Sequence, residues 1–219
     1  MATDTVQNSV YVGPVLRGDG NGGSGLRASR NGGLVVTPEA PALYEPASRG
    51  VIFSCSTALA GTTVVAANNS GVAAAAATIL SLYNPLGSGV NLALIKTGVW
   101  FTSGTPAAGM WCYNVAYNQT ITATPNAVMG RNLPSGAASS ASGFTQTALT
   151  GSGAQLFLRG FGTMFAGALA ATTPALPWDD ASDIVIPPGG VITVCSPATG
   201  TTVIVMASIV YQEVAIQTA

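Results

Sequence analysis

The chain has 219 residues, of which 48% are hydrophobic and only 7% are charged, with a formal net charge of -1. Because soluble proteins usually have about a quarter of their residues charged, this chain has material for a core but little for a charged, solvated surface. Such a surface repels its own copies weakly, which favours residence in an assembly. No run reaches the roughly 18 apolar residues of a membrane span, and the start, MATD, is unlike a secretory signal. We therefore expect a soluble protein made in a cytoplasm, with no membrane partner.

The chain also lacks most of the groups that enzymes use. It contains no histidine, and no Asp or Glu lies between Glu45 and Asp179. General acid–base catalysis, metal binding and nucleophile activation draw mainly on His, Asp, Glu and Cys. A glycan hydrolase would need two carboxylates about 5 to 9.5 Å apart, and only the N-terminal acids and the Asp179 to Asp183 cluster offer them. We predict that the protein is not an enzyme and has no cofactor.

Residues 1–50 are predicted to form an extended N-terminal arm. They contain a glycine-rich run at 18–25, and Pro38, Pro41 and Pro46 keep the following backbone extended. Four of the six arginines lie here, but nearby acids nearly cancel their charge, so a protein partner is favoured over nucleic acid. Because guanidinium groups and aromatic rings suit protein interfaces, the candidate partner-binding residues are Arg17, Arg27, Arg30, Tyr44 and Arg49.

Residues 51–219 are predicted to form one all-β domain. Short β-type runs separated by Gly, Pro, Asn and Ser predict strands at 51–57, 62–67, 78–83, 91–101, 110–117, 155–165, 184–186, 191–196 and 202–214. No segment shows a sustained helical period with end caps, and this includes the alanine run at 73–77. Many antiparallel strands in one domain indicate a two-sheet sandwich of the jelly-roll type.

The stretch at 118–153 is rich in Thr, Ala, Ser, Asn and Gly, which predicts a long surface excursion between core strands. Asp179, Asp180 and Asp183 are either oxygen ligands for a hard cation or a solvated turn, and the sequence leaves both open. Cys55, Cys112 and Cys195 are odd in number and lie among apolar residues. We therefore predict that all three are buried free thiols.

Two segments carry a resemblance to a known group of proteins. They are ALYEPASRGVIF at 42–53 and LYNPLGSGVNLAL at 82–94. With these segments the chain resembles virion proteins of tailed bacteriophages, in particular capsid decoration or cement proteins. The resemblance implies a jelly-roll subunit, commonly a homotrimer, that sits on the outside of the head and ties neighbouring major capsid proteins together.

The expected function is therefore that of a virion structural protein. Its partners would be the major capsid protein and further copies of itself, and its place would be the capsid surface. The alternative is a tail-associated or receptor-binding virion module, whose outer loops would recognise a host surface.

Overall fold

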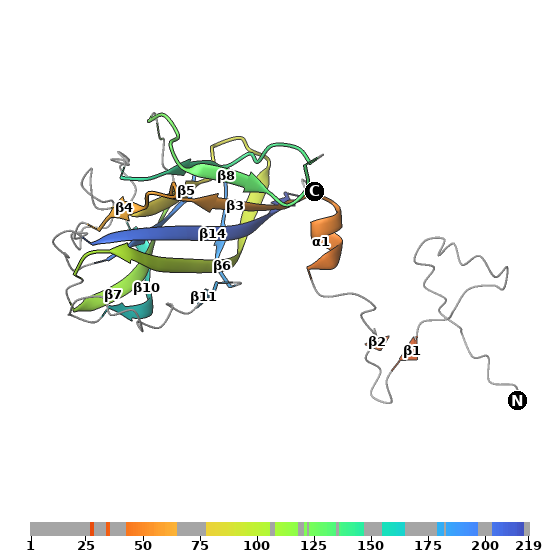
Figure 1. The fold of residues 1–219 in the computed structure, drawn as a ribbon. Coiled ribbons are helices and arrows are strands. Elements are labelled where there is room, and N and C mark those ends of the chain that lie inside the picture. The colour runs from red at the N-terminus through yellow and green to blue at the C-terminus, as the bar shows by residue number, and fades with distance from the viewer. Residues whose placement is uncertain are drawn as a thin grey trace, which may run out of the picture. The chain divides into compact units, whose positions relative to one another are not determined.

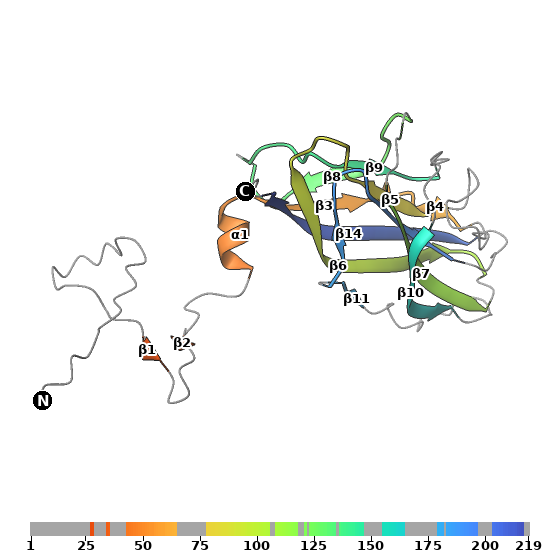
Figure 2. The same ribbon diagram turned by 180° about the vertical axis from the view of Figure 1, so that it is seen from behind.

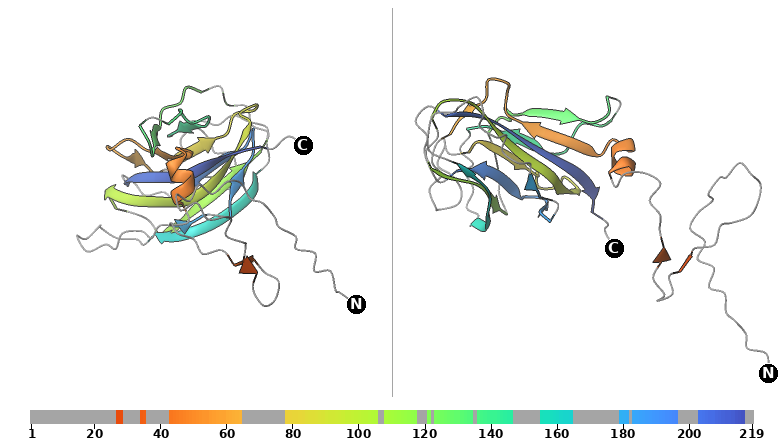
Figure 3. Two further views of the ribbon diagram at one scale, coloured as in Figure 1. Left: turned by 90° about the vertical axis from the view of Figure 1, so that its right-hand side faces the viewer. Right: turned by 60° about the horizontal axis from the view of Figure 1, so that its bottom comes forward.

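The computed structural model describes residues 43–64, 78–105, 108–117, 121, 123–134, 136–146, 155–164, 179–181, 183–196 and 203–216, together with short strands at 27–28 and 34–35. The chain divides into two units, Met1–Ala42 and Leu43–Ala219. In the first unit, β1 (Arg27–Ala28) pairs with β2 (Leu34–Val35) in antiparallel fashion. The second unit is a β-sandwich of two antiparallel sheets (Figure 1), seen from behind in Figure 2 and from two further sides in Figure 3.

One sheet has seven strands, in the order β11-β6-β14-β3-β8, with β12 also paired to β6 and β4 to β14. These strands are β3 (Ile52–Ser56), β4 (Thr62–Thr63), β6 (Val90–Ser103), β8 (Val128–Arg131), β11 (Asp179–Asp180), β12 (Val185–Ile186) and β14 (Ile204–Ala215). The other sheet has five strands, in the order β10-β7-β13-β5-β9. They are β5 (Leu80–Tyr83), β7 (Gly109–Ala116), β9 (Ser142–Phe144), β10 (Gln155–Met164) and β13 (Val191–Cys195).

The strand order is that of a jelly roll. The seven-stranded sheet contains four neighbouring strands in the order β3, β14, β6 and β12. The five-stranded sheet contains four in the order β5, β13, β7 and β10. The chain visits these strands in the order β3, β5, β6, β7, β10, β12, β13 and β14. It therefore crosses from one sheet to the other at every step except β7 to β10, as in a double-sheet jelly roll. The predicted fold class is confirmed, and every strand predicted after residue 50 overlaps an observed one.

The packing between the sheets follows the period-two alternation of the strands. In β14, Val205, Ala207, Ile209 and Tyr211 are buried, and the residues between them are only partly covered. Trp111 and Tyr113 of β7 point into the same core. Burying a large apolar side chain contributes about 1.5–3 kcal/mol, so this contiguous core is what holds the two sheets together.

The segment at 118–153 differs from the predicted surface excursion. It supplies two edge strands, because β8 pairs with β3 and β9 pairs with β5. Phe144 of β9 is only 1% exposed, and it packs with Tyr83, Ala116 and Val191 on the outer face of the five-stranded sheet. The sequence does not predict β9, because Ser142-Gly143-Phe144 has no β-branched residue and is too short to show an alternation of apolar and polar residues.

The N-terminal boundary of the sandwich unit also differs from the prediction. The unit begins at Leu43, and residues 44–48 form the one-turn helix α1 (Tyr44–Ser48) where an extended arm was predicted. The helix is tied to the sandwich, because the side-chain amide of Asn132 donates to the carbonyl oxygen of Ala47 at 2.6 Å.

In the described part of the chain, no helix has the length and apolar character needed to cross a membrane.

Candidate functional site

The surface with the clearest capacity for binding lies at one end of the sandwich. There α1 lies beside the C-terminal end of β14, at the end of the sandwich away from β4 (Figure 1). The backbone N–H of Glu213 donates to the carbonyl oxygen of Val51 at 3.0 Å, which joins β14 to the chain just after α1. The N–H of Ile216 donates to the carbonyl oxygen of Gly89 at 3.0 Å, which joins β14 to the turn between β5 and β6. Three segments that are distant in sequence are thus held together.

These three segments expose apolar side chains. We call this surface the apolar end, and it comprises Leu43 and Tyr44 of the α1 region, Leu86 of the turn, and Val214 and Ile216 of the C-terminal segment. The exposed fractions range from 40% for Leu43 and Ile216 to 61% for Tyr44 and Leu86. Large apolar side chains exposed together are typical of a surface that binds another macromolecule.

The local sequence explains how α1 presents Tyr44. Pro46 lies within the first turn of the helix, where its missing N–H costs no hydrogen bond. The helix stops at Gly50, which has a φ of +71° and can adopt this left-handed conformation without strain. The N–H groups of Gly50 and Val51 donate back to the carbonyl oxygens of Ala47 and Pro46. Tyr44 is thereby fixed near the start of a closed turn and faces solvent.

Two of the five predicted partner-binding residues lie at this end of the sandwich. Tyr44 is exposed on α1, and Arg49 is exposed in the turn that follows the helix. Arg27 belongs to β1 in the N-terminal unit, and its side chain is outside the described part of the structure. Arg17 and Arg30 also lie outside the described residues. The structure therefore brings Tyr44 and Arg49 into the same short region.

Sequence reasoning missed Leu86, Val214 and Ile216. A signal was present for Leu86, because an apolar residue in the turn sequence Asn-Pro-Leu-Gly-Ser-Gly has no core to enter. Val214 and Ile216 have the parity of the β14 face opposite the core residues Val205, Ala207, Ile209 and Tyr211. Because both faces of this strand carry apolar residues, the sequence pattern alone does not show that these two are exposed.

A polar cluster fixes the loop next to the apolar end. The carboxylate of Glu213 accepts from the Ser139 hydroxyl and from the Ser140 N–H, both at 2.7 Å. The Ser139 oxygen also lies 2.6 Å from the hydroxyl of Tyr211, whose pKa is raised by burial. Arg131 donates to the carbonyl oxygen of Gly136. The carboxylate of Glu213 thus holds the loop that contains Ser139 and Ser140.

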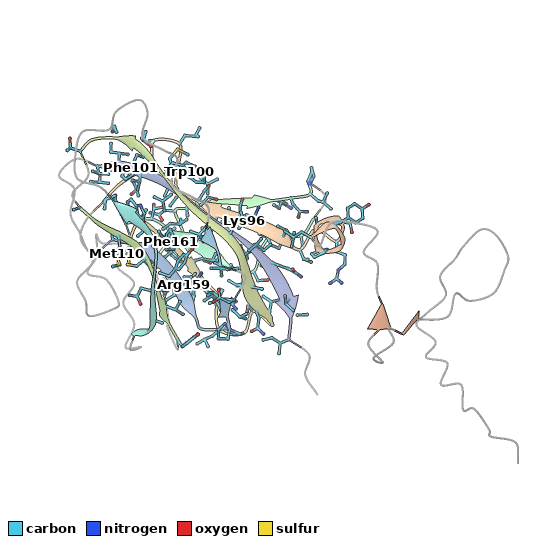
Figure 4. All side chains as sticks on the ribbon, turned by 90° about the horizontal axis from the view of Figure 1, so that it is seen from below. Lys96, Trp100, Phe101, Met110, Arg159 and Phe161 are labelled. Carbon is cyan, nitrogen blue, oxygen red and sulfur yellow. The ribbon has the colours of Figure 1, made fainter. Side chains whose placement is uncertain are left out.

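A second surface lies on the outer face of the seven-stranded sheet. One row across this sheet runs through Gly130, Ser54, Val210 and Lys96, which are register partners on successive strands. A Cβ atom at Gly130 would lie 2.5 Å from the Ser54 hydroxyl oxygen, so a side chain there would require the Ser54 hydroxyl to move. Figure 4 shows Lys96 and Trp100 on β6. The row continues from Lys96 to its register partner Asp180 on β11.

The predicted cation cluster is only partly described, and its described member is already paired. The guanidinium of Arg159 donates to both carboxylate oxygens of Asp183 at 2.7 Å, which lowers the pKa of Asp183. The same guanidinium lies 5.9 Å from the ring centre of Tyr113, and that ring stacks on Phe161 at 4.3 Å (Figure 4). Asp179 and Asp180 pair through their backbones with Thr97 and Lys96. Among the described residues, no three His, Cys, Asp or Glu side chains are placed to hold a metal ion.

The three cysteines are free and buried, as predicted. Cys55 belongs to the core between the sheets, and burial raises the pKa of its thiol to about 12. Cys112 and Cys195 lie elsewhere, on the outer face of the five-stranded sheet, next to each other.

Comparison with known proteins gives no relative. The chain matches no protein-family model, no curated protein and no solved structure.

Proposed function

We propose that this chain is a virion structural protein, a capsid cement or decoration protein that binds the outside of a bacteriophage head and stabilises it. The observation that carries the proposal is the apolar end of a jelly-roll sandwich, to which the arginine-containing N-terminal segment is directly joined. Jelly rolls are common in viral capsid domains. The resemblance of segments 42–53 and 82–94 to phage decoration proteins points the same way, and segment 42–53 contains α1.

The apolar end suits attachment to a protein shell. Tyr44 and Arg49 belong to the residue types that dominate binding energy at protein interfaces, and Leu86, Val214 and Ile216 lie on neighbouring segments. The major capsid protein is the proposed partner. Residues 1–42 would extend the contact, with Arg17, Arg27 and Arg30 as further anchors, and would bind at the cost of ordering entropy.

The described carboxylates of Glu213 and Asp183 are bound to other groups of the chain. Glu213 is held by Ser139 and Ser140, and Asp183 is held by Arg159. The alternative proposal is a tail-associated or receptor-binding module, because jelly rolls also occur as lectin domains.

The test is the survival of phage heads under heat and osmotic shock. Heads that lack this protein are compared after addition of the full chain, of residues 33–219, or of buffer. We expect full protection with the full chain, weaker protection with residues 33–219 because arm anchors are lost, and none with buffer. Loss of several arginine anchors at about 2 kcal/mol each would lower affinity by well over tenfold.

Equal survival in all three samples would reject the cement function. If the purified chain instead bound host cells and left head stability unchanged, the receptor-binding alternative would replace it. Circular dichroism of residues 33–219 is the control for folding, because the sandwich unit begins at Leu43 and should keep its β signal.

A further inference from the structure

Two of the three cysteines form a close pair across neighbouring strands. Cys112 on β7 and Cys195 on β13 are register partners, and their sulfur atoms lie 3.3 Å apart. The sulfur of Cys112 lies 3.5 Å from the carbonyl oxygen of Cys195, and the sulfur of Cys195 lies 3.6 Å from the carbonyl oxygen of Cys112. The two side chains therefore point at each other.

The pair does not belong to the core of the sandwich. Trp111, Tyr113 and Val194, the sequence neighbours of the two cysteines, pack between the sheets. Because side chains alternate along a strand, Cys112 and Cys195 point away from this core, although each is only 3% exposed. Filling the core does not explain why two thiols should face each other here.

We infer that Cys112 and Cys195 are an oxidisable dithiol, which closes into a disulfide between β7 and β13 without displacing either strand. The geometry meets the requirement for such a bond. Register partners on antiparallel strands have Cα atoms about 4.5–5.5 Å apart, and disulfides span Cα distances of about 4.4–6.8 Å. The two sulfur atoms have only to approach by rotation of their side chains.

A peroxide is the class of oxidant that suits this site, because it is small and the two thiols are almost fully buried. The sulfur of Cys112 attacks one peroxide oxygen, the O–O bond breaks, and Cys112 becomes a sulfenic acid while one water leaves. The sulfur of Cys195 then attacks the sulfur of Cys112, the S–O bond breaks, and a second water leaves. Two thiols and one hydrogen peroxide thus give one disulfide and two waters.

The hydrogen bond between the thiols sets the order of attack. The hydrogen bond shared by the two sulfur atoms lowers the pKa of Cys112, whereas the same hydrogen bond and burial raise the pKa of Cys195. Cys112 is therefore the first sulfur to react, since the thiolate is the nucleophile. Cys55 lies apart in the core, where burial holds its pKa at about 12, and serves as an internal control.

The experiment treats the folded full chain with a small excess of hydrogen peroxide, quenches it in acid and counts thiols after denaturation. We expect one remaining thiol, Cys55, a mass lower by two hydrogen atoms, and a peptic fragment that links Cys112 to Cys195. Dithiothreitol should restore all three thiols. The variant Cys55→Ala should lose both of its thiols, and Cys195→Ala should form no link within the chain.

The melting temperature tests whether the bond forms without strain. A disulfide that closes a long loop stabilises the folded state, so the oxidised chain should melt about 5 °C or more above the reduced chain. Three remaining thiols, or oxygen added to the protein with no linked peptide, would overturn the inference. A linked protein that melts at or below the temperature of the reduced form would show that the strands must move, and would overturn it as well. None of these readouts depends on binding to a capsid.

Discussion

At the scale of single residues, Gly143 illustrates how little space separates the two sheets at the β9 edge. A Cβ atom there would lie 2.5 Å from the sulfur of Cys55, 2.8 Å from the Cβ of Ala127 and 2.9 Å from the sulfur of Met129. We expect Gly143→Ala to lower the free energy of unfolding by about 1–3 kcal/mol, because added volume in a packed region forces its neighbours apart. Urea denaturation measures this loss.

Gly160 provides the matched control for Gly143. It lies on β10, and the nearest atom to an added Cβ is the flexible sulfur of Met110 at 3.3 Å. Gly160→Ala should change stability little or raise it slightly, because alanine has less freedom than glycine to lose on folding. Equal losses for the two variants would contradict the tight packing described for β9.

The buried thiol of Cys55 and the buried hydroxyl of Tyr211 predict how the free energy of unfolding changes at alkaline pH. Burial raises the pKa of Cys55 from 9.0 to about 12 and raises that of Tyr211 above its ordinary value of 10.0. Both groups keep their protons more tightly in the folded state, so their contribution to stability is complete below the unfolded pKa. This contribution is lost as the pH rises from the unfolded pKa to the folded pKa. Over that interval each group lowers the free energy of unfolding by up to about 1.4 kcal/mol per pH unit.

Urea unfolding at about pH 8 and about pH 10.5 measures this dependence. Wild-type protein should be clearly less stable at the higher pH. Cys55→Ala should show a smaller difference between the two pH values, although the variant is less stable overall because it leaves a small cavity. If the two proteins lost the same free energy between these pH values, Cys55 would not be the group responsible.

At the scale of elements, the apolar end predicts which surface substitutions affect binding. Tyr44→Ala and Leu86→Glu change side chains that are 61% exposed, so neither should lower the unfolding free energy by more than about 0.5 kcal/mol. Each should weaken binding to heads that lack this protein by about tenfold or more if these residues act as interface anchors. Cosedimentation with such heads measures the affinity.

Leu59 is the control for the apolar end. It lies in the turn between β3 and β4 and is 87% exposed, more than any residue of the apolar end. Leu59→Glu should therefore bind heads like the wild-type protein. If Leu59→Glu weakened binding as much as Leu86→Glu, general loss of exposed apolar surface would explain the effect, and the apolar end would not be the binding surface.

Strands with a β-type run of their own could be predicted from sequence, including the short β4 and β12, whereas β8, β9 and α1 could not. Segments such as β6 and β14 carry a sustained alternation of buried and open residues, which only a strand produces. The strands β8 and β9 exist because β3 and β5 offer them unpaired edges, and this is information about tertiary structure. Likewise, α1 is held by Asn132, which is distant in sequence and contacts the helix only after folding.

The candidate site was predictable in part, for the same reason. Tyr44 and Arg49 stand out by residue type in the sequence. That Leu86 and Ile216 join them follows from the backbone bond between Ile216 and Gly89, which no local pattern encodes. The pairing of Cys112 with Cys195 depends in turn on the register of β7 and β13.

At the scale of the whole molecule, low charge and open sheet edges lead to a prediction about assembly. The edges of the described sheets are β8, β9, β10 and the pair β11 and β12, and these leave backbone groups that a second chain can reach. Only 7% of residues are charged, so copies repel each other weakly. Closed cyclic symmetry covers such surfaces without leaving an open end. The resemblance to decoration proteins implies three copies, and we therefore predict a homotrimer.

Multi-angle light scattering at micromolar concentration tests the homotrimer, with an expected mass three times the 21.8 kDa of one chain. Because the interface is expected to be largely apolar, raising the salt from about 0.1 M to about 1 M should leave the trimer intact, whereas charge pairs at a surface would be screened. Residues 33–219 should give a trimer as well, since we propose that residues 1–42 contact the capsid and that the sandwich forms the subunit interface. A stable monomer of the full chain at this concentration would contradict the prediction. A trimer of the full chain together with a monomer of residues 33–219 would instead assign the arm to the subunit interface, and the arginines would then join copies of this protein to each other.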